Sequence, residues 1–422
     1  MKSLTFIAAV LAASSIAATA QTAVPQSLAS TAPIAIPIAP TVPDPVDTPW
    51  PGGAMTLEID ASDVTRGLYR VTQTIPLAPE GQGASARRLT LLFPQWLPGT
   101  HAPRGPIAEL ADLRFTVDGK AATWRRDPVE VNAFHIALPE GARAVVATFV
   151  HTSPLQTSEG RITMTQEMLN LQWEKMSLYP AGHYVRRIRV RPAVTFPAGW
   201  TAATSLDSAS TALSAASPSA PNRVAWAETD YETLVDSPIF AGRWFRRWQL
   251  GNGAVLSAVA DEPDLLNAQP ENIAAIAATV GEALAVFGRP PFDRYDFLVA
   301  LTSRMGGIGL EHLRSSENQM EPRDFVDWKG TDWDHNVLSH ELTHAWNGKY
   351  RRPATMWAPD YRQPTRNDLL WVYEGQTQFW GWVLAARSGL QQKDTVLGMM
   401  ASSAGLYTQQ PGREWRSVED TT

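Results

Sequence analysis

The segment His340-Glu341-Leu342-Thr343-His344 constrains this 422-residue chain more than any other feature of its sequence. On an α-helix, side chains four positions apart lie on one face, so the imidazoles of His340 and His344 can bind one zinc ion. Glu341 would then reach the attacking water and act as a general base. The neighbouring positions are mostly apolar, and buried histidines beside a buried carboxylate need a compensating partner. This context favours a metal site over the alternative, a surface helix with two incidental histidines.

A catalytic zinc site uses three protein ligands, so the third must come from another segment. Glu374 is a lone acid in the apolar, aromatic segment 371–375 (WVYEG), and we predict it as that ligand. The alternative for Glu374 is a helix cap or an ion pair with an arginine. His335 is a rival ligand, but its position five residues before His340 predicts that it faces solvent or packs locally. Gln378, one turn after Glu374, is predicted to hydrogen-bond a histidine ligand.

The region from about residue 250 onward alternates helix and strand signals. Residues 271–287 have helical spacing with many alanines, and 296–301 (DFLVAL) is typical of a buried strand. Two helices are expected to carry the chemistry. The first covers about 334–347 with Gly348 at its end, and the second covers about 368–388 with Asp368 as its cap and Gly389 after its end.

Residues 54–249 are predicted to form an antiparallel β domain. Short β-branched or alternating runs are separated there by Gly, Pro and Asp turns. The expected strands include 57–59, 69–74, 89–93, 145–150 and 188–194. The Ser/Ala-rich stretch 203–222 is expected to be a surface loop.

The first 20 residues are predicted to be a secretory signal peptide. A lysine is followed by a short apolar stretch and by the small-x-small site Ala18-Thr19-Ala20. The alternative is a membrane anchor, but the apolar stretch is short for a bilayer span. Residues 21–53, rich in Pro and Ala, are predicted to be an extended tether. We therefore expect an exported protein, periplasmic or secreted, without stable membrane insertion after signal cleavage.

Charge and cysteine content narrow the possible partners and ligands. The net charge is −6 and there is no long basic run, so a nucleic-acid partner is not expected. Because the chain has no cysteine, its metal ligands must be histidines and carboxylates, and no disulfide can stabilise it.

Taken together, these motifs resemble the M61 peptidase family, the glycyl aminopeptidases. The resemblance rests on the HELTH segment, the later WVYEG segment, the upstream segment 309–312 (GLEH) with Ser315-Ser316, and 92–100 (LFPQWLPGT) in the β region. It implies an α+β chain: an N-terminal antiparallel β domain, then a thermolysin-like mixed α/β zinc peptidase domain over 250–422, and the start of a helical C-terminal part. It implies Zn²⁺ held by His340, His344 and Glu374, with Glu341 as general base. Relative to the family, the chain is expected to be truncated at the C-terminus, without the family's PDZ domain.

The same resemblance implies a substrate-binding role for Glu311, with Gly309 and His312 beside it. In the related M1 aminopeptidases, a Gly-x-x-Glu-Asn element binds the free α-amino group of the substrate. A carboxylate partner for that ammonium group would fix which peptide bond is cleaved. This chain departs from the M1 pattern, with His312 in place of the asparagine and Ile308 in place of the first glycine.

The predicted function is zinc-dependent removal of N-terminal residues from peptides. A preference for Gly or Ala follows from the family resemblance alone. The alternatives are a zinc endopeptidase, in which Glu311 would bind no amine, and a non-catalytic exported binding protein stabilised by zinc. Retention of Glu341 disfavours the latter, because a structural zinc site needs no general base. The sequence leaves the oligomeric state open.

Overall fold

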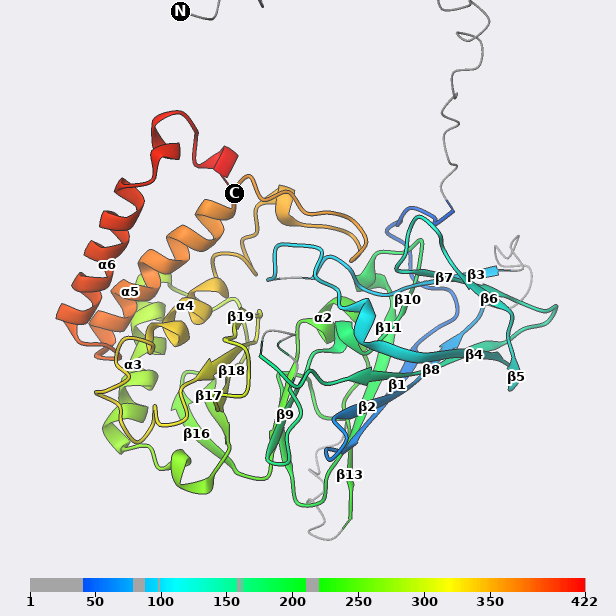
Figure 1. Cartoon of the computed structure of the whole chain (residues 1–422), viewed down its shortest axis with the longest axis horizontal. Helices are drawn as coiled ribbons and strands as arrows, with labels where there is room; N and C mark the ends of the chain where they lie inside the picture. The colour runs from blue at the N-terminus through cyan, green and yellow to red at the C-terminus, as the bar shows by residue number, and fades with distance from the viewer. Residues whose placement is uncertain are drawn as a thin grey trace, which may run out of the picture. The chain divides into compact units, whose positions relative to one another are not determined.

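The computed structural model describes residues 41–78, 88–97, 99–157, 161, 163–209 and 220–421, and Val42 to Thr422 form one compact unit. This unit is mixed α+β, as predicted, with β-sheets in its first half and most helices in its second half (Figure 1). The predicted signal peptide, residues 21–40 of the predicted tether and residues 210–219 of the predicted loop lie outside the described residues.

The β domain is built on an eight-stranded sheet. Its order is β13-β11-β1-β2-β8-β4-β5, with β14 also paired to β11. All neighbours are antiparallel except β1 and β11, which run parallel. Alternate residues of β1 and β2 are buried, so one face of the sheet covers the core of the domain. The strands are β1 (Met55–Asp63), β2 (Leu68–Pro76), β4 (Leu110–Val117), β5 (Lys120–Ala121), β8 (Ala144–Thr152), β11 (Arg189–Phe196), β13 (Asn222–Ala225) and β14 (Thr229–Asp230).

Two smaller sheets and one short helix complete the β domain. The four-stranded sheet has the order β10-β3-β7-β6, and the three-stranded sheet has the order β12-β15-β9. Their elements are β3 (Arg88–Leu92), β6 (Trp124–Arg126), β7 (Ala133–Ala137), β9 (Met168–Leu171), β10 (Tyr179–Pro180), β12 (Thr201–Ala203), α2 (Tyr231–Val235) and β15 (Ile239–Gly242). All five strands expected from the sequence are present.

Both predicted ends of the β domain need correction. Residues 41–53, assigned to the tether, pack on the domain: Val42 is in its core, and Val46 forms a β-bridge with His183. At the other end, the predicted boundary at residue 249 falls inside β16 (Phe245–Gly251), which pairs with β17 of the following domain. Side-chain packing decides the first point and strand pairing decides the second, and composition reports neither.

The second domain contains a five-stranded mixed sheet of order β16-β17-β18-β20-β19. The added strands are β17 (Ala254–Ala260), β18 (Tyr295–Leu301), β19 (Gly309–Glu311) and β20 (Ser315–Met320). The central strand β18 is buried at every position, which confirms the buried strand predicted from DFLVAL. The short edge strand β19 pairs antiparallel with β20 and ends at Glu311.

Four helices pack together at the sheet of this domain: α3 (Pro270–Phe287), α4 (Asn336–His344), α5 (Thr377–Ser388) and α6 (Lys393–Thr408) (Figure 1). Apolar residues of α3 and α4 form the core with β18. By length and composition, α3 is also apolar enough to cross a membrane. This is weak evidence for a membrane span, because Ile276, Val280 and Ala283 are buried in this core. Short 3-10 helices lie at Ile107–Glu109, Trp173–Lys175, Val185–Arg187, Pro263–Leu266, Ala354–Met356, Pro411–Glu414 and Glu419–Thr421.

The second predicted chemistry-bearing helix begins differently from the prediction. Its first turn, Trp371–Gln376, is a π-helix that leads into α5. Asp368 does not cap it, because its carboxylate accepts a hydrogen bond from the Thr355 hydroxyl at 2.6 Å. Gly389 follows α5 with a φ of +75°, as the sequence predicts for a helix end.

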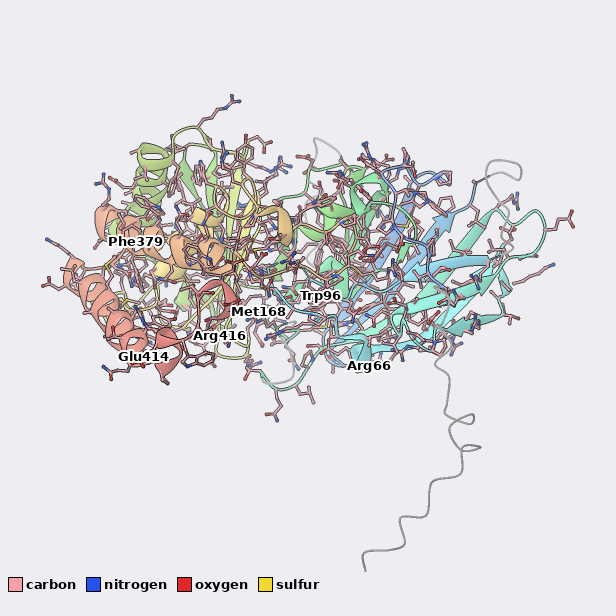
Figure 2. All side chains as sticks on the ribbon, turned by 90° about the horizontal axis from the view of Figure 1, so that it is seen from above. Arg66, Trp96, Met168, Phe379, Glu414 and Arg416 are labelled. Atoms are coloured by element: carbon pink, nitrogen blue, oxygen red, sulfur yellow. The ribbon has the colours of Figure 1, made fainter. Side chains whose placement is uncertain are left out.

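The loop after β3 in the β domain contacts the second domain. The backbone N–H groups of Gln95 and Trp96 donate to the carbonyl of Tyr361 at 3.0 and 2.8 Å. Figure 2 shows Trp96 between the two domains, whereas Phe379 lies among the helices at the far end. This loop continues to His101 and so brings a β-domain segment to the site described next.

Candidate active site

The single helix α4 brings His340, Glu341 and His344 together. The Nε2 atoms of the two histidines are 3.1 Å apart, and the nearest ligand atoms of all three residues lie within 4.8 Å of one another. Close packing against α5 holds the helix in place. Ser339 Oγ donates to the carbonyl of Gly381 at 2.8 Å, and a Cβ at Gly381 would lie 3.0 Å from His340 Cα, so a larger residue would push the helices apart.

Glu374 adds a third candidate ligand from the π-helical turn. Its Oε2 lies 3.4 Å from Nε2 of both His340 and His344. Three ligand atoms at about 2.0–2.1 Å from one tetrahedral metal ion are about 3.3 Å apart. The observed separations of 3.1, 3.4 and 3.4 Å therefore fit a single zinc-sized ion. Wide helical turns of this kind often occur at functional sites.

The orientation of the His344 ring suits metal binding. Its Nδ1 lies 3.0 Å from the carbonyl of Asn347, and because a carbonyl only accepts, Nδ1 carries the hydrogen and donates. In the neutral ring, which is the form that binds a metal, Nε2 then has its lone pair toward His340 and Glu374. Thr377 Oγ1 is also 3.4 Å from this Nδ1. The predicted histidine partner Gln378 is thus replaced by Asn347 and Thr377 in the structure.

The centre carries an excess of negative charge. Burial alone would lower the pKa of His344, but the hydrogen bond to Glu374 and the nearby carboxylates of Glu311 and Glu341 raise it to about 9. Burial alone would raise the pKa of the Glu374 carboxyl, but hydrogen bonds from His101, His340 and His344 hold it well below its usual range. An ionised carboxylate among imidazoles and two further carboxylates is an environment that a divalent cation would neutralise.

Glu341 is buried at the floor of the site. Burial raises the pKa of its carboxyl to about 7, although the neighbouring histidines act in the opposite direction. Its Oε1 lies directly against Gly309 of β19, where a Cβ atom would overlap it. The structure therefore explains the glycine at position 309 by the space that the Glu341 carboxylate occupies.

Glu311 enters the same site from the end of β19. Its side chain is buried, and its Oε1 accepts a short hydrogen bond from the Tyr373 hydroxyl. Gly99 of the β domain lies over this carboxylate, and a Cβ there would be 2.9 Å from Glu311 Oε2 and would overlap Leu310. Glu311 therefore lies between the catalytic helices and the β-domain loop, with a hydroxyl and a glycine as its immediate neighbours.

Two family models match the chain, and several solved structures resemble it. The models are the peptidase M61 N-terminal domain over residues 56–243 and the M61 glycyl aminopeptidase domain over residues 333–422, together about two thirds of the chain. The chain belongs to the M61 peptidase family.

One structural neighbour supports the fold of this M61 chain. An aminopeptidase N family protein from Idiomarina loihiensis matches with a TM-score of 0.66 and 19% identity over 81% of this chain. The M61 chain spans 56% of that protein's length. Other neighbours include a point mutant of an M1 zinc metallopeptidase from Deinococcus radiodurans (TM-score 0.49, 14% identity, 86% of this chain and 76% of that one) and leukotriene A4 hydrolase from Saccharomyces cerevisiae (0.46, 14%, 80% and 49%). No curated protein sequence matches the chain.

His312, predicted to bind substrate, has both ring nitrogens engaged elsewhere. Its Nδ1 is 3.2 Å from Asp236 and its Nε2 is 3.2 Å from Glu317. Burial alone would lower the pKa of His312, but these two carboxylates raise it to about 9. Lys349 also contacts Asp236, at 2.6 Å. In the M61 chain His312 is thus part of a buried ionic network beside the site.

His335, considered as a rival ligand, is fully buried, so the expectation that it faces solvent is wrong, whereas local packing is confirmed. Its ring stacks on Trp328 with centroids 3.8 Å apart, and its Nδ1 lies 3.2 Å from the carbonyl of Leu390. These contacts direct the ring away from His340 and toward the core of the catalytic domain.

Sequence reasoning missed His101 and Tyr373. His101 Nε2 lies 2.8 Å from Glu374 Oε1, and its ring packs edge-on against Tyr373 with centroids 4.9 Å apart. Tyr373 directly precedes the predicted ligand Glu374, and its hydroxyl contacts Glu311. His101 directly follows the segment that carries the M61 resemblance in the β domain, which is the only signal that could have identified it.

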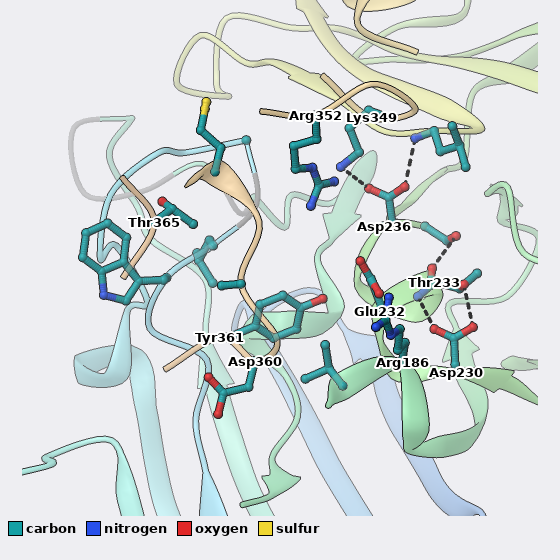
Figure 3. Close-up of a pocket in the computed structure, with 18 of the residues that line it drawn as sticks. Arg186, Asp230, Glu232, Thr233, Asp236, Lys349, Arg352, Asp360, Tyr361 and Thr365 are labelled. Atoms are coloured by element: carbon teal, nitrogen blue, oxygen red, sulfur yellow. Dashed lines mark hydrogen bonds and ion pairs between the residues drawn. The ribbon is translucent and has the colours of Figure 1, made fainter. Parts of the chain in front are cut away.

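A cavity of about 390 Å³ adjoins the centre between the two domains of the M61 chain (Figure 3). Gly99, His101 and Tyr373 line the cavity and also contact residues of the candidate site, and Asp236, Lys349 and Tyr361 line it too. Figure 3 shows the Lys349 amine directed at the Asp236 carboxylate across one side of the cavity. The candidate site is therefore accompanied by a space to which both domains contribute.

Proposed function

We propose that this chain is a zinc-dependent aminopeptidase that removes N-terminal residues, preferably Gly or Ala, from peptides. The observation that carries the proposal is the triangle of His340 Nε2, His344 Nε2 and Glu374 Oε2, with sides of 3.1, 3.4 and 3.4 Å. Two buried carboxylates, Glu341 and Glu311, lie at this triangle. The preference for small residues rests on family membership alone.

His340, His344 and Glu374 would hold the zinc ion. When bound, zinc polarises the carbonyl of the scissile bond and makes water a better nucleophile. The protein contributes a fixed arrangement of ligand atoms, with the His344 ring held by the Asn347 carbonyl.

Glu341 is the proposed general base. Its carboxylate takes a proton from the attacking water and later delivers it to the nitrogen of the leaving amine. Its pKa of about 7, raised by burial, is close to the value that lets one group accept and then return a proton near neutral pH. Gly309 leaves Glu341 Oε1 the space to lie beside the ligand set.

Glu311 is the proposed anchor of the substrate's α-ammonium group. The Tyr373 hydroxyl contacts Glu311 Oε1 in this structure, which satisfies one acceptor site of the carboxylate. A carboxylate has further acceptor positions, so an ammonium group can bind beside the hydroxyl. An ammonium–carboxylate pair in a buried site would fix the distance from the N-terminus to the cleaved bond and exclude blocked peptides.

We further propose that the protein acts after export, in a periplasm or outside the cell, on peptides and not on nucleic acid. The basis is the N-terminal sequence with its small-x-small site and the net charge of −6 without a basic run. Stable membrane insertion after signal cleavage is not part of this proposal. Localisation of the processed protein by cell fractionation would test it.

The direct test compares an alanyl or glycyl chromogenic amide with its N-acetylated counterpart, each with and without a zinc chelator. Cleavage of only the free-amine substrate, lost on chelation and restored by zinc, would support both the metal chemistry and the role of Glu311. Equal cleavage of both substrates would indicate an endopeptidase and remove the amine-binding role. A zinc-loaded protein that cleaves neither would favour a binding protein that uses zinc for stability.

A further inference from the structure

His101, from the β domain, contacts the predicted metal ligand on the catalytic domain. The two residues are 273 positions apart, and His101 Nε2 lies 2.8 Å from Glu374 Oε1. Because an ionised carboxylate only accepts, Nε2 carries the hydrogen and donates it to Oε1. The other carboxylate oxygen, Oε2, is the one that faces His340 and His344.

The backbone holds His101 in an unusual conformation at this place. Its φ is +51°, in the left-handed region that only a few per cent of non-glycine residues adopt. The carbonyl of His101 accepts a hydrogen bond from Asn367 Nδ2 at 2.8 Å, and the ring packs on Tyr373. Contacts from the catalytic domain therefore fix both the main chain and the ring of a β-domain residue.

Glu374 needs such an anchor more than the other two ligands do. Its side chain is 37% exposed, whereas that of His344 is 1% exposed. A glutamate side chain has several rotatable bonds, so an unanchored carboxylate must lose rotamer freedom when it binds a metal. Among the described residues, His101 is the hydrogen-bond partner of the Glu374 carboxylate that lies outside the ligand set.

We propose that His101 is a positioning residue for the metal site, through which the β domain holds Glu374 in its ligating orientation before and during turnover. This inference rests on the proposed function, because it takes His340, His344 and Glu374 as zinc ligands. Hydrogen bonds from outside the ligand set typically change metal affinity by about 10- to 100-fold when removed. The chain would accordingly need its β domain for the metal site as well as for substrate contacts.

The test measures zinc affinity by competition with a chromogenic chelator, together with kcat and KM, on the full chain and two variants. His101→Ala removes the donor, and His101→Gln keeps an N–H donor at a similar reach. We expect His101→Ala to weaken zinc binding about 10- to 100-fold and to lower kcat at limiting zinc, with KM changed less than about twofold. His101→Gln should recover most of the affinity.

Controls separate this inference from a folding defect and from failure of the proposed function. His183→Ala, which alters a β-domain histidine near Thr48 away from the centre, should behave as wild type. Melting temperatures of the metal-free proteins should agree within a few degrees. Unchanged zinc affinity in His101→Ala, or a fall in kcat that saturating zinc does not reverse, would overturn the positioning role. A wild-type protein that binds no zinc would overturn the proposed function and this inference together.

Discussion

Helix α4 and the β-domain loop that ends at His101 contribute to the catalytic centre in opposite ways. The helix supplies His340, Glu341 and His344 within about one turn, so helical geometry alone brings them together. The loop supplies Gly99 and His101, whose places at Glu311 and Glu374 depend on how two domains pack. The chemistry is therefore encoded locally, whereas its alignment is encoded over long distances in the sequence.

Substitutions in the two regions should therefore have different effects on catalysis. On α4 they should remove a chemical step, and on the loop or on β19 they should shift groups that remain present. The size and the kinetic signature of each defect would test this distinction.

The largest effect is expected for Glu341→Gln on the helix. Glutamine is nearly isosteric but cannot accept the proton of the attacking water, so kcat should fall by about 10²- to 10⁴-fold. Zinc binding and melting temperature should change little, because Glu341 is not one of the three predicted ligands. Steady-state kinetics with a chelator competition assay would measure this. A rate equal to wild type would show that Glu341 is not the base.

Gly309→Ala tests whether β19 aligns the base. The added Cβ would overlap Glu341 Oε1 and lie 3.0 Å from Val337 Cγ2, so the carboxylate must move. Because a displacement of about 1 Å can cost 10²-fold in rate, kcat should fall about 10- to 100-fold. Gly281→Ala in α3 is the matched control, since a Cβ there meets nothing within 4 Å, and its activity should equal that of wild type. Equal kinetics for both variants would contradict the alignment by β19.

The difference between local and long-range encoding also explains which features the sequence could predict. The residues of α4, the buried strand β18 and the β-domain strands follow periodic patterns that report local geometry. Glu374 could be proposed because a lone acid in an apolar segment requires an explanation. The π-helical turn that presents it, and the histidine that holds its second oxygen, arise from tertiary packing and leave no periodic signal.

His312 shows that a place next to a site residue in the sequence can wrongly suggest a role in the site. Its place beside Glu311 in the sequence suggested substrate contact, but alternate residues of an extended segment face opposite sides, and its ring is directed to Asp236 and Glu317. Domain boundaries were predicted less well than elements, because the pairing of β16 with β17 is invisible in composition.

Gly99→Ala tests the β-domain loop with a smaller expected effect. A Cβ at this position would overlap Leu310 and lie 2.9 Å from Glu311 Oε2, so it should displace the proposed amine anchor. We expect KM for free-amine substrates to rise about tenfold, with less change in kcat. Gly119→Ala is the control, because its φ of +81° imposes a similar backbone strain where a Cβ meets nothing within 4 Å. If Gly119→Ala gives the same KM as Gly99→Ala, strain and not the contact with Glu311 is responsible.

The smallest effect on turnover is expected for the ionic network beneath the site. His312 has a pKa of about 9 in the folded protein, because the Asp236 and Glu317 carboxylates outweigh the opposing effect of burial, against about 6.5 in an unfolded chain. A raised pKa contributes stability that is fully present below pH 6.5 and is lost as the pH rises through 9. The wild-type free energy of unfolding should therefore fall by about 3 kcal/mol across this window, and His312→Gln should give a flatter profile. Urea unfolding at several pH values measures both profiles, and parallel curves would show that His312 is not charged in the fold. A flatter profile with kcat nearly unchanged would show that the charged His312 ring stabilises the fold without controlling the rate.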